Sequence, residues 1–280
     1  MFFIFGLFLG SFLNNIALRL ERNEDYLFSR SKCPNCGKVL TWKELIPLLS
    51  FLIQKGRCKN CSTKISLRYP LVEIFTGLWV YLLAKTILPS GSALVCTKSV
   101  LVCVLPLIEF LFYLIFLSVL FVLALYDLKT FLVDDRLILF GIIVGFLFWG
   151  FKIYFQITPR DFSYLFNYLF FQFGKFEPIF SALFLSSIFL LIYLVTQGKG
   201  LGFGDVKTAF LMGLFLRLGD GILSIVFASL LGSIYGIYLI LKNKKFHQPI
   251  PFVPFFFLGT LMTIFFGQTI SKFYFSFFEF

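Results

Sequence analysis

Charged residues are scarce in this chain of 280 residues: they make up only 14% of it, whereas 59% of the residues are hydrophobic and 21% are aromatic. A soluble domain of this length could not bury so much apolar surface, which excludes a soluble fold. Apolar runs of about 20 residues recur along the sequence, and each is long enough to cross a bilayer as a helix. We therefore expect an all-α polytopic membrane protein.

Histidine is nearly absent as well, since His247 is the only one in the chain. No Ser–His pair is evident, and no histidine lies near Cys61 in the sequence, so a serine or cysteine hydrolase finds no support. The Gly-x-x-x-x-Gly-Lys-Ser/Thr spacing of a phosphate-binding loop is also missing. The first residues lack a basic start and a small-residue cleavage site, so residues 2–18 are expected to form a membrane helix and not a signal peptide.

About eight transmembrane helices are expected. They lie near residues 2–18, 71–88, 100–125, 137–155, 178–196, 206–218, 222–241 and 251–268. The span at 206–218 is short and contains Gly213. If it is re-entrant, the number of spans becomes odd and the C-terminus moves to the other side.

Basic residues gather on one side of these expected spans. Of the 25 Lys and Arg residues, 18 fall in four polar segments, which are 19–70, 126–136, 197–207 and 242–250. The positive-inside rule makes that side cytosolic and places both termini outside. The net charge of +11 is therefore interpreted as membrane topology, and no nucleic-acid partner is expected.

Residues 19–70 form the only sizeable polar insertion, so the expected division is a first helix at 1–18, a cytosolic module at 19–70 and a membrane core at 71–280. The module carries two C-x-x-C pairs, Cys33 with Cys36 and Cys58 with Cys61. Four thiolates in this spacing predict a closed structural zinc site, and a redox pair would need a βαβ context that is missing here. Cys96 and Cys103 either oxidise together or remain two unpaired thiols.

Two aspartates, Asp127 and Asp205, each follow an apolar or glycine-rich run at the expected cytosolic boundary. Carboxylates at a membrane boundary are costly and usually functional. Two carboxyls close together share one proton, so one can activate a water while the other hydrogen-bonds a scissile carbonyl. The pair thus predicts an aspartyl protease, with Gly202 and Gly204 admitting an extended substrate strand. The competing interpretation is two solvated loop acids that balance nearby lysines.

Other charged residues are interpreted with alternatives. We expect Lys129 and Lys207 to point toward phosphates or solvent. Asp134 and Asp135 either support the aspartate pair or belong to a solvated turn or a helix cap. Glu73 either pairs with Arg68 or lines the active-site entrance. Glu109 lies inside the third span unless that helix starts at Pro106, and it is the best candidate site for the alternative function, a membrane transporter with a zinc-stabilised domain.

Taken together, the motifs resemble those of the type IV prepilin peptidases, the GxGD-type membrane aspartyl proteases. The resemblance covers nearly the whole chain. It rests on Gly10-Ser11-Phe12-Leu13-Asn14 with Arg19-Leu20, the four cysteines, Gly56-Arg57-Cys58, residues 65–73, Gly202-Phe203-Gly204-Asp205-Val206-Lys207, and Pro251-Phe252-Val253-Pro254-Phe255. In two places the chain departs from the family pattern: Asp134-Asp135 stands where Pro-Asp is usual, and Gly198-Lys199-Gly200-Leu201 replaces Arg-Glu-Gly-Met.

The resemblance implies that Asp127 and Asp205 are the catalytic pair and that the four cysteines bind Zn²⁺. It also implies cleavage of the short basic leaders of prepilins or pseudopilins, after a glycine, at the cytosolic face of the bacterial inner membrane. N-methylation of the new N-terminus with S-adenosylmethionine is implied by the resemblance alone, because we can assign no residues to it from the sequence.

Overall fold

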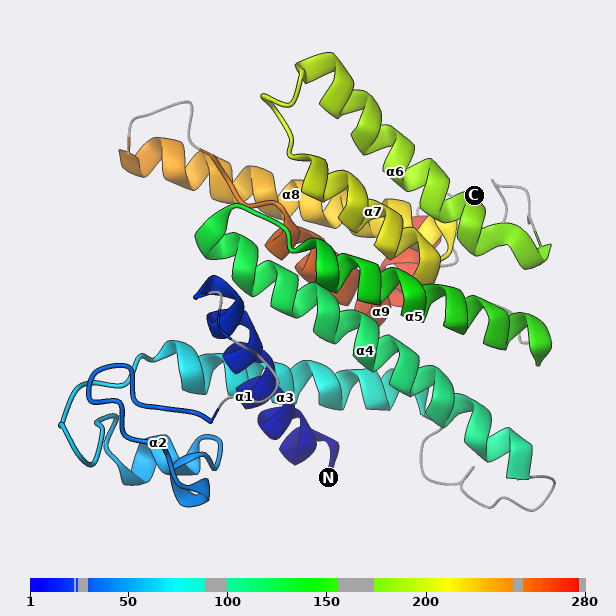
Figure 1. Cartoon of the computed structure of the whole chain (residues 1–280). Coiled ribbons are helices and arrows are strands. Elements are labelled where there is room, and N and C mark those ends of the chain that lie inside the picture. Colours follow the sequence, from blue (N-terminus) through cyan, green and yellow to red (C-terminus); the bar gives the residue numbers. More distant parts are fainter. Residues whose placement is uncertain (23, 25–29, 89–99, 156–173, 244–248, 277–280) are drawn as a thin grey trace. The chain divides into compact units, whose positions relative to one another are not determined.

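The computed structural model of the chain describes residues 1–280 except 23, 25–29, 89–99, 156–173, 244–248 and 277–280 (Figure 1). In the described part every regular element is a helix, and extended pairing is limited to two isolated β-bridges. The expected all-α fold is therefore confirmed. The chain divides into two compact units, Met1–Lys85 and Thr86–Phe280, which are described separately below.

The first unit holds two long helices and a small module between them. Its elements are α1 (Phe2–Glu21), η1 (Trp42–Glu44), α2 (Leu49–Ile53) and α3 (Arg68–Ile87), the last of which runs two residues beyond the unit. Helices α1 and α3 approach closely because small residues lie where they meet. A Cβ added to Gly6 would lie 2.7 Å from the Cα of Gly77, and one added to Gly10 would lie 2.8 Å from the side chain of Thr76. Such small-residue contacts are typical of helices that associate within a bilayer.

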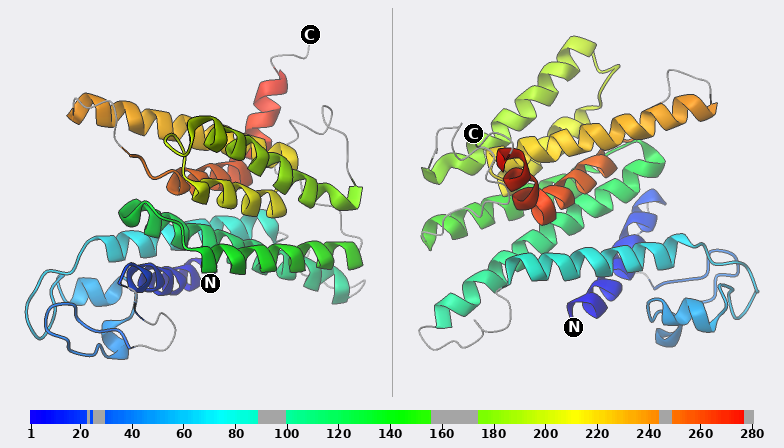
Figure 2. Two further views of the ribbon diagram at one scale, coloured as in Figure 1. Left: turned by 45° about the horizontal axis from the view of Figure 1, so that its top comes forward. Right: turned by 180° about the vertical axis from the view of Figure 1, so that it is seen from behind.

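The second unit is a helical bundle, shown from two further directions in Figure 2. Its elements are α4 (Val100–Thr130), α5 (Asp135–Tyr154), η2 (Gly174–Phe176), α6 (Glu177–Thr196), α7 (Phe203–Phe215), α8 (Leu218–Asn243) and α9 (Val253–Ser276). Helix α7 packs against α5 and α6, while α9 packs against α4 and α8. Aromatic rings fill part of the core: Phe116 and Phe215 stack with ring centroids 4.3 Å apart, and Phe148 lies beside them.

Seven of the described helices are long and apolar enough to cross a membrane, so the chain is a multi-pass membrane protein. The predicted span at 206–218 is instead the 13-residue helix α7, most of whose residues are buried inside the protein. Tyr113 and Ser181 donate hydrogen bonds to the carbonyls of Phe215 and Leu216 at its C-terminal end. The segment is apolar because it faces neighbouring helices, and hydropathy alone does not distinguish that environment from lipid.

The predictions for Cys96, Cys103 and Glu109 have different outcomes. Cys96 lies outside the described residues, as does the side chain of Cys103, so their pairing stays open. Glu109, by contrast, is described: it is buried within α4, which continues through Pro106 to Val100. A helix start at Pro106 is therefore wrong.

The close approach of α6 and α7 gives a stability prediction. A Cβ on Gly213 would lie 2.5 Å from the backbone nitrogen of Ala182, whereas one on Gly150 in α5 would meet nothing within 4 Å. Gly213→Ala should lower the free energy of unfolding by about 1–3 kcal/mol through overpacking. Gly150→Ala should be neutral or stabilise by up to about 1 kcal/mol. Thermal unfolding of the two variants in detergent compares them, and equal stabilities would contradict this packing.

Candidate functional site

Asp127 lies in the last turn of α4 and is only 5% exposed. Its Oδ2 accepts a hydrogen bond from the backbone N–H of Val253, at 3.1 Å. Val253 is the first residue of α9, where backbone N–H groups have no partner within the helix. The carboxylate therefore caps a helix 126 residues further along the chain, and its orientation is set by that contact. In the sequence, the start of α9 is marked by Pro251 and Pro254.

Asp205 is the third residue of α7, and its Oδ2 accepts a hydrogen bond from the N–H of Gly202 at 3.3 Å. A carboxylate in the first turn of a helix is normally favoured by the helix dipole, which would lower its pKa. Here burial and the negative charge of Asp127 outweigh these effects and raise the pKa of Asp205 to about 7. The fold has thus brought the two predicted aspartates within electrostatic reach of each other.

The loop between α4 and α5 and the first residue of α5 each contact the N-terminal end of α7. A Cβ on Gly204 would lie 2.5 Å from Cγ2 of Val133, so a glycine is needed at 204 to admit the valine. Lys207 Nζ lies 2.6 Å from Asp135 Oδ1. No sequence signal pointed to Val133, because a single valine in a loop forms no pattern that predicts its contacts.

Gly202 differs from Gly204. It has ordinary extended backbone angles, with φ −77° and ψ 148°, which any residue can adopt. A Cβ added there would lie 3.7 Å from Asp205 Oδ2, an ordinary contact distance. Neither the backbone angles nor the packing requires a glycine at position 202. Because Gly202 has no side chain, the space beside the Asp205 carboxyl group stays open.

Two predictions for neighbouring charges have clear outcomes. Lys207 was expected to face phosphates or solvent. Its side chain is partly exposed, and its ammonium group pairs with the exposed carboxylate of Asp135. Asp134 is a helix cap, as one of the alternatives held: its Oδ1 accepts hydrogen bonds from the N–H groups of Arg136 and Leu137 at the start of α5. Lys129 lies at an exposed position near the end of α4.

Glu73 belongs to the first unit and is buried in α3. Its Oε2 accepts a hydrogen bond from the backbone N–H of Leu48 at 2.9 Å. The predicted pairing of Glu73 with Arg68 is wrong, since Arg68 Nη1 lies 3.2 Å from Glu21 Oε1 instead. Glu73 thus anchors the small module to α3.

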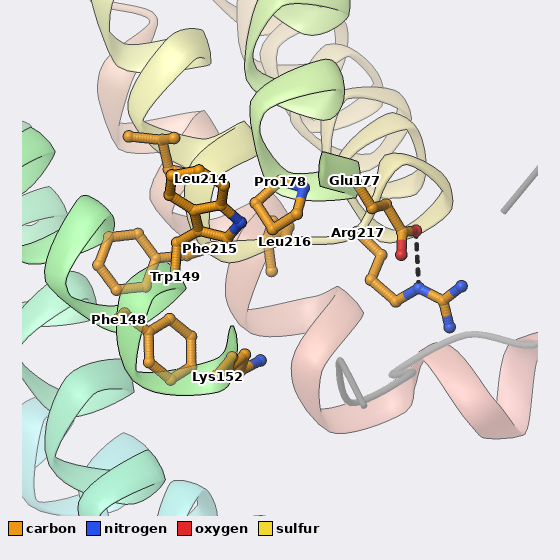
Figure 3. Close-up of a pocket in the computed structure, with 9 residues that line it drawn as sticks. All are labelled: Phe148, Trp149, Lys152, Glu177, Pro178, Leu214, Phe215, Leu216 and Arg217. Carbon is orange, nitrogen blue, oxygen red and sulfur yellow. Dashed lines mark hydrogen bonds and ion pairs between the residues drawn. The ribbon is translucent and has the colours of Figure 1, made fainter. Parts of the chain in front are cut away.

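A second group of charged residues lies at the other end of the α5–α7 core, around the pocket in Figure 3. The pocket is lined by Phe148, Trp149, Lys152, Glu177, Pro178, Leu214, Phe215, Leu216 and Arg217. Arg217 Nε lies 2.8 Å from Glu177 Oε1, and Lys152 Nζ lies 3.6 Å from Glu109 Oε1. Glu109 thus forms an ion pair between α4 and α5, which explains how a carboxylate is tolerated within a membrane helix.

The four cysteines of the module form one cluster. The Sγ atoms of Cys33, Cys36, Cys58 and Cys61 all lie within 4.8 Å of one another. The Sγ atoms of Cys33 and Cys61 are 3.8 Å apart. This is about the sulfur–sulfur separation, roughly 3.8 Å, of a tetrahedral site with Zn–S bonds near 2.3 Å, and it is far longer than a disulfide. The donor set therefore fits a metal ion.

The two halves of the cluster have the same backbone design. The N–H of Cys33 donates to the carbonyl of Lys38, and the N–H of Cys58 donates to the carbonyl of Thr63 in the matching position. Each turn ends on a residue with positive φ, Gly37 at 68° and Ser62 at 57°. Such paired turns preorganise four thiolates without a large hydrophobic core.

Metal analysis tests this cluster. The purified protein should contain about one zinc ion per chain, and Cys36→Ser or Cys61→Ser should lower the content severalfold, because a closed structural site needs four ligands. Cys96→Ser, a cysteine outside the cluster, serves as the control and should keep full occupancy. Elemental analysis by mass spectrometry measures the content, and an unchanged zinc level in the cluster variants would contradict the site.

Comparisons with known proteins agree with this arrangement. The model of the Bacterial Peptidase A24 N-terminal domain matches residues 4–87, and that of the Type IV leader peptidase family matches residues 114–237. A Bacillus subtilis protein named prepilin leader peptidase/N-methyltransferase is 32% identical over 97% of this chain and 96% of its own length. Proteins of the same name from Aeromonas salmonicida and Pseudomonas aeruginosa are 31% and 28% identical, each over 98% of this chain and 92% of the relative.

No solved structure matches the chain. The sequence relatives nevertheless extend over almost its full length, and the two family models cover both the cysteine cluster and the aspartate pair. The chain therefore belongs to the type IV prepilin leader peptidase family.

Proposed function

We propose that Asp127 and Asp205 are the catalytic pair of a membrane endopeptidase that removes the leaders of prepilins or pseudopilins. The observation that carries the proposal is electrostatic: burial and the charge of Asp127 raise the pKa of Asp205 to about 7. Asp205 then retains a proton near neutral pH. A carboxyl pair with one proton is the arrangement that aspartyl proteases use.

The hydrogen-bond partners suggest a role for each carboxyl group. The N–H of Val253 stabilises negative charge on Asp127 Oδ2, so Asp127 is suited to act as the general base. Asp127 removes a proton from a water, whose oxygen attacks the scissile carbonyl carbon, while Asp205 donates its proton to the carbonyl oxygen. The peptide C–N bond then breaks as Asp127 returns its proton to the leaving nitrogen. Asp205 recovers a proton from the tetrahedral hydroxyl group.

The open space at Gly202 supports an extended substrate strand beside Asp205. A strand that lies close to a backbone needs a position without a side chain, and Gly202 provides one. We propose that the strand is the basic leader of a prepilin, cut after a glycine at the edge of its apolar helix. From the basic segments and the positive-inside rule, we propose that this reaction occurs at the cytosolic face of a bacterial inner membrane.

The relatives' names also include N-methyltransferase. We propose the same second activity here, although the described part of the module offers no group that we can assign to S-adenosylmethionine. Glu44, the one carboxylate between residues 30 and 70, already binds Thr41 and Lys38.

We assign Zn²⁺ to the four cysteines as a structural ion. We also propose that the chain divides into a first membrane helix at 1–18, a cytosolic module at 19–70 and a membrane protease core at 71–280.

Charge-neutralising substitutions test the pair. Asp127→Asn and Asp205→Asn should each lower cleavage of a prepilin with a Lys-Gly-Phe junction by about 100- to 10,000-fold, since each removes an acid or base. Asp134→Asn is the matched control: it makes the same change in the neighbouring loop and keeps a good helix cap. The assay uses reconstituted protein and mass detection of the product. Near-normal cleavage by either Asn variant would move the active site elsewhere.

The pH dependence follows from the raised pKa of Asp205. The proton on Asp205 is present below its pKa of about 7 and is lost as the pH rises through that value. Cleavage should therefore fall above pH 7, approaching tenfold per pH unit at higher pH. Initial rates between pH 5 and about 9 measure this limb. A rate that continues to rise above pH 8 would contradict the role of Asp205 as the proton donor.

The contact of Gly204 with Val133 gives a compensation test. Gly204→Ala should lower cleavage by at least about tenfold, because overpacking costs about 1–3 kcal/mol and displaces the start of α7. Val133→Ala removes the nearest atom, Cγ2, so the double variant should recover part of the activity. Recovery is partial since the Cβ of residue 133 remains 2.9 Å from the new methyl group. A double variant no better than Gly204→Ala would exclude this contact as the cause.

A further inference from the structure

The module between α1 and α3 exposes an apolar face, formed by Trp42, Leu45, Leu49, Leu52 and Ile53, which we call the 42–53 face. Trp42 is 70% exposed, Leu52 68% and Ile53 72%. Leu49, Leu52 and Ile53 share one side of α2, because residues three and four apart lie together on a helix. Exposed apolar groups gathered in so small a module indicate an interaction surface.

The height of this face relative to the membrane is set by one hydrogen bond. The N–H of Leu48, directly before α2, donates to Glu73 Oε2 at 2.9 Å. Glu73 lies five residues into α3, and the candidate membrane span starts at the first residue of that helix, Arg68. At 1.5 Å per residue, Glu73 is roughly 7–8 Å inside the span. Figures 1 and 2 show α2 beside the first turns of α3.

A second contact fixes the same end of the unit. Arg68 at the start of α3 forms an ion pair with Glu21 at the end of α1. Both helices are candidate spans, so the module leaves and re-enters the membrane at this level. The 42–53 face therefore lies near the end of α3 at which the candidate span begins.

The charge of the module favours anionic lipids. Residues 30–68 contain nine Lys or Arg and a single acid, Glu44, which pairs with Lys38. Lys43 and Lys55 flank the apolar side chains, and the ammonium group of Lys43 lies 5.5 Å from the Trp42 ring. A tryptophan with basic neighbours beside an apolar helix face is the composition of segments that lie in the membrane interface.

We propose that the 42–53 face is a membrane-docking surface whose occupant is the anionic phospholipid leaflet. The apolar side chains enter the headgroup region, while the surrounding lysines contact lipid phosphates. The cysteine cluster is thereby held against the bilayer. This inference does not depend on the proposed cleavage chemistry, because it rests only on residues of the first unit.

Site-specific photocrosslinking tests the docking surface in the full-length protein. Benzoylphenylalanine replaces Leu52, and in a control variant it replaces Lys59, an exposed residue of the cysteine turn. Each variant is reconstituted in vesicles of phosphatidylethanolamine and phosphatidylglycerol, irradiated and analysed by mass spectrometry, with wild-type zinc content as the folding control. We expect phospholipid adducts at 52 to exceed those at 59 by about fivefold or more, because a docked face contacts lipid continuously. Replacing phosphatidylglycerol with phosphatidylcholine should reduce them.

Three outcomes would overturn the proposal. One is a lipid adduct yield at 52 no higher than at 59. Another is an adduct with the chain's own peptides in place of lipid, which would make the face an internal contact. The third is a lipid adduct that a prepilin displaces and replaces with its own, which would make the face a substrate-binding surface.

Discussion

The hydrogen bond from Val253 to Asp127 joins the end of α4 to the start of α9, and the candidate site depends on it. In a membrane protein a buried carboxylate needs a partner, and the unpaired N–H groups at a helix start need an acceptor. One contact meets both needs. The hydrogen bond fixes the orientation of Asp127, and the negative charge of Asp127 helps to raise the pKa of Asp205.

The position of Asp205 depends on a different principle, which is close packing of a short helix. Helix α7 is too short to be counted as a span and is surrounded by α5 and α6. Glycines permit this: Gly213 lies against the backbone of Ala182, and Gly204 lies against Val133. The carboxyl group at the start of α7 is consequently held by packing at both ends of the helix, which is how a site on a membrane protein obtains rigid geometry.

The first unit uses polar contacts in a similar way. Glu73 captures the N–H of Leu48, and Arg68 pairs with Glu21, so the module is attached where the two membrane helices end. The four cysteines then organise a segment that has few buried apolar residues of its own. The apolar side chains on the outer side of α2 are exposed and do not belong to the core of the first unit.

Much of the architecture could be predicted from the sequence. The all-α membrane fold follows from apolar runs whose length matches a bilayer, and the cysteine cluster follows from two C-x-x-C pairs, because both are local patterns. Asp127 and Asp205 were also identifiable as unusual acids at helix ends. The division of the chain into a first helix at 1–18, a cytosolic module at 19–70 and a membrane core at 71–280 remains a prediction.

Contacts between distant residues were decided only by the tertiary structure. The partner of Asp127 lies 126 positions away, Lys207 turned out to pair with Asp135, and Glu73 accepts from Leu48 and not from nearby Arg68. Helix α7 was mistaken for a span because burial in protein and burial in lipid select the same apolar residues. The sequence by itself determined which groups are costly to bury, whereas the packing of helices determined which partner each of them received, since partners are chosen by proximity in space and not along the chain.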